Sequence, residues 1–134
     1  MIRIGLIDHY LDEWHANHYP DMIRAEVGRR GIPMEVVCAY ADCDKEGGLS
    51  TREWCERQAC ERAASLEEIA RACDAFLLLA PSFPELHEEL ARIPLALGKP
   101  VFVDKIFAPD RQTGERIFAH AASRRAPVFS SSAL

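Results

Sequence analysis

Histidine and carboxylate side chains gather near the start of the chain, where three of each occur: Asp8, His9, Asp12, Glu13, His15 and His18. On a helix, His15 and His18 would share one face because they are three residues apart. Imidazole and carboxylate groups together suit zinc or another transition metal. Their spacing matches no zinc signature, however, and such residues are common as caps at helix starts. We therefore predict no metal site, and expect Trp14 and His15 to pack or hydrogen-bond at the mouth of a crevice.

The cysteines show neither disulfide spacing nor a nucleophile signal. There are five of them, Cys38, Cys43, Cys55, Cys60 and Cys73. Their odd number and lack of a tight pair are typical of reduced thiols in a cytosolic protein. None has a plausible activating histidine by sequence, so we assign no thiol chemistry.

Composition places the chain among globular proteins. Its 134 residues suit one domain, and 49% apolar and 28% charged residues argue against a disordered or membrane protein. Sixteen basic against 21 acidic residues give a net charge of −5, which argues against binding to nucleic acid or to an anionic membrane. An apolar run begins directly at Ile2 and leaves no room for a signal peptide, so we expect a cytoplasmic protein.

Short apolar runs recur along the chain and predict β-strands. The strong ones cover residues 1–7, 34–40, 75–80, 100–104 and 127–130, and a weak one lies near 60–62. Strands that are apolar on both faces and alternate with helices specify a parallel sheet that is covered on both sides.

Helix signals fill the intervals between these runs. Apolar residues fall at helical spacing from Tyr19 to Val27, in a helix that Pro20 either kinks or opens. Three Ser-x-x-Glu capping boxes predict helices that start at Ser50, Ser65 and Ser82. Asp110 is expected to cap a helix over residues 111–124.

This alternation predicts one α/β domain over residues 1–134, a doubly wound Rossmann-like sheet of six mainly parallel strands with helices on both faces. The expected strand order is 3-2-1-4-5-6. Ligands bind such sheets beyond the strand carboxyl ends, at the switch point between strands 1 and 4. The segments that face this point are residues 8–15, 40–44, 80–83 and 104–107.

Three segments resemble the Gfo/Idh/MocA oxidoreductases. They are Arg-Ile-Gly-Leu-Ile at 3–7, Asp-Ala-Phe-Leu-Leu-Leu-Ala-Pro at 74–81 with His87 beyond it, and Gly-Lys-Pro-Val-Phe-Val-Asp-Lys at 98–105. The resemblance covers essentially the whole chain and corresponds to the family's N-terminal nucleotide-binding domain, with no match to its larger C-terminal domain. It implies an NAD- or NADP-dependent oxidoreductase that acts on a hydroxyl or carbonyl carbon of a sugar- or cyclitol-like substrate. Because the family's acid/base residue comes from the C-terminal domain, we expect little or no turnover by this chain alone.

The resemblance also implies roles for particular residues. Asp104 and Lys105 are similar to the family's Glu-Lys-Pro motif, whose lysine lies beside the nicotinamide ribose and the substrate hydroxyl. Lys105 is therefore the candidate catalytic residue, although Ile106 replaces the motif's proline. Pro81 and Ser82 begin the loop that runs along the dinucleotide in this family.

The first loop departs from the dinucleotide fingerprint, which needs glycine where backbone approaches the pyrophosphate. Aligned on Gly5, the first two fingerprint glycines fall on Asp8 and Tyr10, with His9 between them. These three residues are expected to contact the cofactor, yet the tyrosine would fill the space of the phosphates and Asp8 would repel them. Asp12 and Glu13 stand where the next helix should begin, and carboxylates there would compete with a bound anion.

Asp42 follows the second strand and is the candidate partner for an adenosine ribose. A carboxylate at this place favours NAD over NADP. Residues 42–44 could equally form a plain polar loop.

The missing glycines leave an alternative function open. In it, the chain is a degenerate Rossmann domain that binds no dinucleotide and serves as an interaction or ligand-sensing module. An interface left uncovered by the absent domain would also permit a homodimer.

Overall fold

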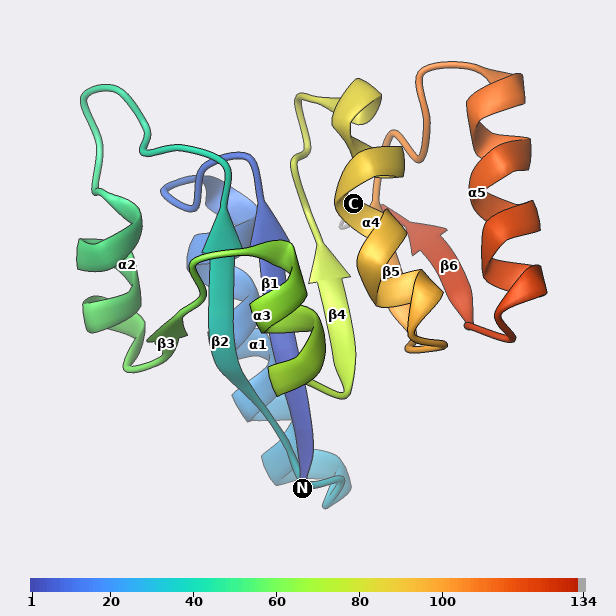
Figure 1. The fold of residues 1–134 in the computed structure, drawn as a ribbon. Coiled ribbons are helices and arrows are strands. Elements are labelled where there is room, and N and C mark those ends of the chain that lie inside the picture. The colour runs from blue at the N-terminus through green and yellow to red at the C-terminus, as the bar shows by residue number, and fades with distance from the viewer. Residues whose placement is uncertain (133–134) are drawn as a thin grey trace.

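The computed structural model describes residues 1–132 and contains a single six-stranded sheet (Figure 1). The strands are β1 (Ile2–Asp8), β2 (Met34–Ala41), β3 (Glu61–Arg62), β4 (Ala75–Leu78), β5 (Val101–Asp104) and β6 (Val128–Ser131). Their order is β3-β2-β1-β4-β5-β6, and all five pairings are parallel. The predicted fold class and strand order are confirmed. The carboxyl ends of β1 and β4 therefore lie side by side at the switch point.

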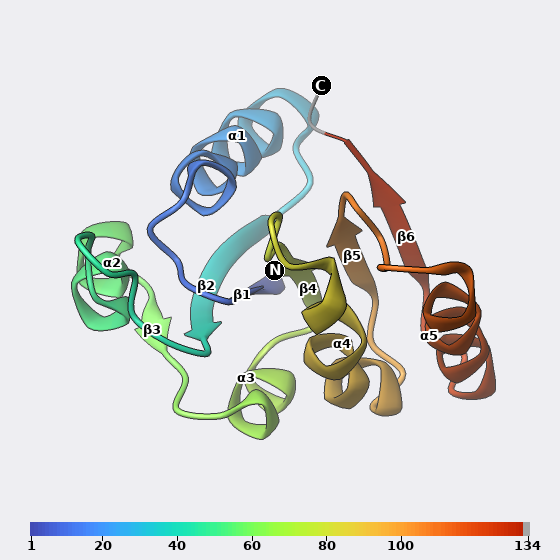
Figure 2. The same cartoon turned by 90° about the horizontal axis from the view of Figure 1, so that it is seen from above.

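Helices cover the sheet on both faces (Figure 2). One face carries α1 (Trp14–Arg30) and α2 (Thr51–Gln58), and the other carries α3 (Leu66–Ala72), α4 (His87–Ala96) and α5 (Arg111–Ser123). A short 3₁₀ helix, η1 (Pro84–Leu86), precedes α4. Side chains of β1 point alternately to the two faces, so Leu6 packs with Trp54 in one core and Ile7 with Leu78 in the other.

Helix α1 begins earlier than its apolar spacing indicates. It starts at Trp14 and continues through Pro20, so of the two alternatives for Pro20 the one in which it opens the helix is wrong. Glu13 caps its first turn, and Gly31 ends it in the left-handed region at φ 70°. Glycine enters that region at little cost because it has no Cβ atom.

The three predicted capping boxes have different outcomes. Ser50 forms the complete box with Glu53. Ser65 caps α3, but the carboxylate of Glu68 accepts from the Ala64 amide in place of the Ser65 amide. Ser82 caps no helix, because the next helical turn starts only at Pro84 and has no side-chain cap. The prediction for Ser82 is therefore wrong.

One half of the sheet is open on the side that carries α1. Figure 2 shows α1 beside β1 and β2, while no helix among residues 1–132 covers β5 and β6 on that side. An apolar groove of about 330 Å³ runs there between α1 and the sheet, lined in part by Tyr19, Met22, Phe102 and Phe129. None of the helices in residues 1–132 is long and apolar enough to span a membrane.

Candidate functional site

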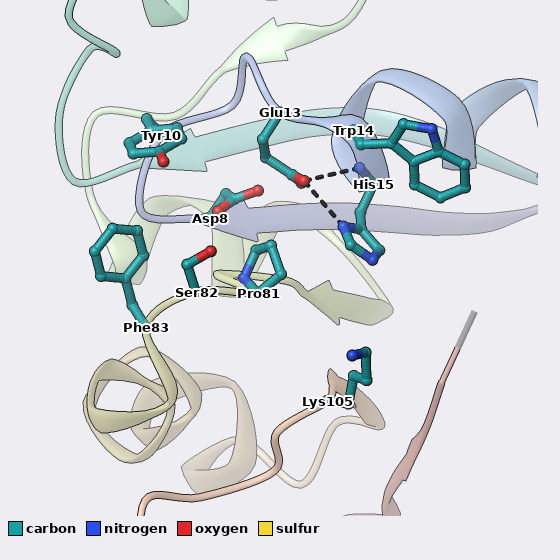
Figure 3. Close-up of a pocket in the computed structure, with 9 residues that line it drawn as sticks. All are labelled: Asp8, Tyr10, Glu13, Trp14, His15, Pro81, Ser82, Phe83 and Lys105. Carbon is teal, nitrogen blue, oxygen red and sulfur yellow. Dashed lines mark hydrogen bonds and ion pairs between the residues drawn. The ribbon is translucent and has the colours of Figure 1, made fainter. Parts of the chain in front are cut away.

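A pocket of about 390 Å³ opens at the switch point (Figure 3). It is lined by residues from the loop after β1, the first turn of α1, the loop after β4 and the end of β5: Asp8, Tyr10, Glu13, Trp14, His15, Pro81, Ser82, Phe83 and Lys105. These segments meet because parallel strands bring their carboxyl ends to one edge of the sheet.

The structure brings together five of the residues predicted to form the site: Asp8, Tyr10, Pro81, Ser82 and Lys105. The other three lie outside the pocket lining. His9 and Asp42 contact each other on the side toward β2, and Asp104 is fully buried at the end of β5. The sequence places Phe83 and Glu13 in segments that face the switch point, but it gives Phe83 no role and Glu13 none beyond competing with an anion.

Asp8 ends β1 as a buried carboxyl group with 1% of its surface exposed. Its Oδ1 accepts from the amides of His9 at 2.7 Å and Ala80 at 3.0 Å, whereas no donor in residues 1–132 reaches Oδ2. Burial raises the pKa of Asp8 to about 9, and the adjacent Glu13 side chain adds to this effect. At neutral pH Asp8 is therefore an uncharged acid that can donate a hydrogen bond.

Glu13 closes the first turn of α1. Its Oε2 accepts from the His15 amide at 2.8 Å and its Oε1 from the Ala16 amide at 2.7 Å. Oε2 also lies 3.0 Å from Nδ1 of the His15 ring (Figure 3). The carboxylate thus takes the amide donors and the positive dipole end that a helix offers to an anion.

His15 connects α1 to β5. Its Nε2 lies 3.4 Å from Oδ2 of Asp104, on the side of the ring opposite the Glu13 contact. Neither oxygen of Asp104 receives a hydrogen bond of normal geometry from the described residues. Burial raises the pKa of Asp104, and the nearby His15 lowers it in part. The histidine is the ionisable group that bridges these two carboxyl groups.

Aromatic rings cross the switch point from one loop to the other. The Phe83 ring lies 4.4 Å from that of His9 and 5.8 Å from that of Tyr10, measured between centroids. These contacts join the loop after β1 to the loop after β4. They lie beside the loop that carries the fingerprint glycines in a Rossmann fold.

Asp42 is held by its neighbours at the end of β2. Its carboxylate lies 3.1 Å from Nδ1 of His9 and accepts from the Tyr40 hydroxyl at 3.2 Å. On the other side of the His9 ring, Nε2 lies 3.7 Å from Sγ of Cys43. The sequence gives no cysteine a plausible histidine partner, but the fold brings His9 next to Cys43. Burial, Asp42 and Asp44 raise the pKa of Cys43, so its thiol stays protonated at neutral pH.

Lys105 is exposed and directs its side chain into the pocket from the end of β5 (Figure 3). It faces the loop after β1 across the cavity, and the peptide bond that follows it, to Ile106, is cis. An ammonium group in this place can donate hydrogen bonds to a hydroxyl, a carbonyl or a ribose.

The pocket fits one end of a dinucleotide better than the other. Lys105 and Ser82 supply polar groups where the strands β4 and β5 end. At the fingerprint spacing, all three glycine positions carry side chains that line the pocket, namely Asp8, Tyr10 and Glu13. The fingerprint needs glycine at these positions, and the Glu13 carboxylate already accepts from the helix amides, so the residues present do not fit a pyrophosphate.

Ionisable side chains elsewhere suggest no metal centre. Within residues 1–132, no group of three histidine, cysteine, aspartate or glutamate side chains could hold a metal ion. All five cysteines are free thiols.

No family model and no curated protein matches the chain. Solved structures do. A dehydrogenase (MviM) from Clostridium difficile is 22% identical, with a TM-score of 0.72 over 97% of this chain and 39% of its own. The WlbA dehydrogenase from Chromobacterium violaceum, in complex with NADH and UDP-GlcNAcA, is 18% identical, with a TM-score of 0.76 over 97% of this chain and 34% of its own.

A third similar structure is a biliverdin reductase from Synechocystis in complex with biliverdin and NADP⁺. It is 19% identical, with a TM-score of 0.71 over 97% of this chain and 37% of its own. The chain therefore spans between 34% and 39% of the length of these three proteins. At this identity the likeness establishes the fold. That fold is the nucleotide-binding fold that the resemblance implied.

Proposed function

We propose that the chain is the nucleotide-binding domain of an NAD(P)-dependent oxidoreductase of the Gfo/Idh/MocA kind. The observation that carries the proposal is Lys105, which enters the switch-point pocket of a fold that matches dehydrogenases over 97% of the chain. The substrate class proposed is a sugar- or cyclitol-like molecule, which reacts at a hydroxyl or carbonyl carbon. A bound nicotinamide would supply the hydride acceptor or donor.

Within this function, Lys105 is the residue proposed to contact the reacting end of the cofactor and the substrate hydroxyl. Pro81 and Ser82 would lie along the dinucleotide, because both line the same pocket. Asp42 favours NAD over NADP, since a carboxylate at the end of β2 accepts from a ribose hydroxyl and repels a 2′-phosphate. Asp8, His9, Tyr10 and Asp104 complete the proposed cofactor surroundings.

The remaining length of the similar dehydrogenases has no counterpart in these 134 residues. We propose that residues beyond this domain supply the acid/base group and the substrate-binding surface. By itself the chain should then show little or no turnover.

A second function has one observation in its favour. The side chains of Asp8, Tyr10 and Glu13 stand at the three glycine positions, so the residues present do not fit a pyrophosphate. A domain of this shape could serve as an interaction or ligand-sensing module without any dinucleotide. The two functions differ in what Lys105 does, because a module of that kind does not need it to contact a cofactor.

Calorimetric titration of the chain with NADH, and separately with NADPH, distinguishes the two proposed functions. We expect saturable one-to-one binding with NADH preferred. Lys105→Met should weaken that binding by about tenfold or more, since a hydrogen bond from a charged donor contributes about 1.5–3 kcal/mol.

Arg52→Met is the matched control for this substitution. It also removes one positive charge, but Arg52 is exposed on α2 and lies outside the pocket lining. If the two variants weaken NADH binding equally, the proposed role of Lys105 in contacting the cofactor is contradicted. Absence of heat with both cofactors would favour the module.

A further inference from the structure

We infer that Glu13 is an internal anion that occupies the diphosphate position of this fold and must leave it before a dinucleotide can bind. The inference deepens the proposed function and rests on it. It explains why the residues present do not fit a pyrophosphate, because an acidic side chain of the protein itself competes with the ligand.

The first support is what the Glu13 carboxylate binds. Its two oxygens accept from two successive amides of α1, those of His15 and Ala16, at 2.8 and 2.7 Å. Free amides in the first turn of a helix are the groups that bind phosphate in Rossmann folds. A carboxylate with two acceptor oxygens and a negative charge substitutes for that phosphate.

The second support is the burial of this contact. Only 10% of the Glu13 side chain is exposed, and its Oε2 also bonds to the His15 ring at 3.0 Å. An ordinary surface cap makes one such bond and leaves the rest of its side chain in water. With three contacts, Glu13 is held firmly at the third position of the glycine fingerprint.

The third support comes from Asp8, which ends β1 beside the first turn of α1. This group is nine-tenths buried or more, lines the same pocket, and its Oδ2 receives no hydrogen bond from residues 1–132. Because its pKa is raised to about 9, Asp8 carries a proton at neutral pH, and the neighbouring Glu13 is one cause of that rise. The same proton could be donated to a phosphate oxygen once Glu13 had left. Asp8 therefore suits an anion in either state.

The experiment titrates NADH, and separately inorganic pyrophosphate, into the wild-type chain and three variants. Glu13→Gly restores the fingerprint residue, and glycine is an acceptable helix cap. Glu13→Gln removes the charge and keeps an acceptor for the helix amides, so it guards against a loss of folding. Asp12→Asn is the matched control, because Asp12 bonds to the Leu49 amide and to Asn17 and lies outside the pocket lining.

We expect Glu13→Gly to bind both ligands at least about tenfold more tightly than the wild type, with Glu13→Gln between them and Asp12→Asn unchanged. Unchanged or weaker binding by Glu13→Gly, with a melting curve that shows it folded, overturns the inference. An equal gain in affinity in Asp12→Asn also overturns the inference, because the loss of any nearby negative charge would then explain the effect.

The outcomes separate this inference from the proposed function. If the wild type binds NADH tightly and Glu13→Gly weakens that binding, the result supports the proposed function and contradicts the inference about Glu13. If Glu13→Gly gains affinity for pyrophosphate but no variant binds NADH, the result supports the inference that Glu13 is an internal anion and contradicts the proposed function. Binding of neither ligand by any variant would overturn both.

Discussion

The proton on Asp8 removes one negative charge from the pocket. Asp8 stays protonated until about pH 9, because burial penalises its charged form and Glu13 lies beside it. In an unfolded chain the same carboxyl would ionise near pH 4. Between these values the folded state holds a proton that the unfolded state has released. Asp8 therefore lowers the stability of the fold as pH rises through that window.

We expect Asp8→Asn to remove this dependence. Asparagine keeps an acceptor for the amides of His9 and Ala80 and can donate to Glu13 without ionising. Relative to the wild type, the variant should gain up to about 1.4 kcal/mol of unfolding free energy per pH unit between about pH 4 and 9. Urea denaturation at pH 5, 7 and 9 measures the difference.

The exposed Asp21 supplies the control for that experiment. Asp21→Asn should follow the wild-type dependence on pH. A constant gap between Asp8→Asn and the wild type at all three pH values would contradict the raised pKa of Asp8.

At the scale of elements, local sequence signals succeed where a helix end depends only on its own residues. Ser50 and Glu53 satisfy each other's backbone amides without help from the rest of the fold. Ser82 and Glu85 have the same spacing, but Pro84 starts a turn between them and Ser82 faces the pocket. A capping pattern is therefore decisive only if no competing start signal lies within it.

This difference predicts unequal costs for two similar substitutions. Ser50→Ala should destabilise the fold by about 1 kcal/mol, the usual cost of a lost cap. Ser82→Ala should change stability by no more than about 0.5 kcal/mol, as for a side chain without such a role. The midpoints of urea unfolding curves compare the two variants, and equal shifts would contradict the assignment.

The sheet could be predicted because its strands are short, apolar on both faces and separated by helix signals. The candidate site could be predicted only in part. The fingerprint spacing points to position 13 once it is counted from Asp8, so the place of Glu13 was accessible from the sequence. The contacts of Phe83 with Tyr10, and of Cys43 with His9, join segments that are distant in the chain. No local pattern encodes them, because the strand order creates them.

At the scale of the whole molecule, the open half of the sheet is the largest departure from a fully covered fold. Phe129 on β6 and Met22 on α1 are 57% and 50% exposed at the two sides of the apolar groove. Apolar surface of this kind favours association.

We expect the chain to self-associate through this groove, and Phe129→Lys to abolish that association in sedimentation experiments. Phe118→Lys is the matched control. Phe118 is 50% exposed, but it lies on α5, which packs on the opposite face of the sheet. Loss of association in both variants, or in neither, would assign the contact to another surface.

The strand order also constrains the course of folding. The central strand β1 pairs on one side with β2, which follows it closely, and on the other side with β4, where Ile4 lies opposite Ala75. Residues 2–62 can therefore assemble one half of the sheet from nearby contacts, and residues 75–131 the other half. Joining β4 to β1 closes the longest loop in the sheet, and loop closure must precede the contacts that stabilise it. The pairing of β1 with β4 is thus expected to set the folding rate, and the switch-point pocket between these strands to form in that last step.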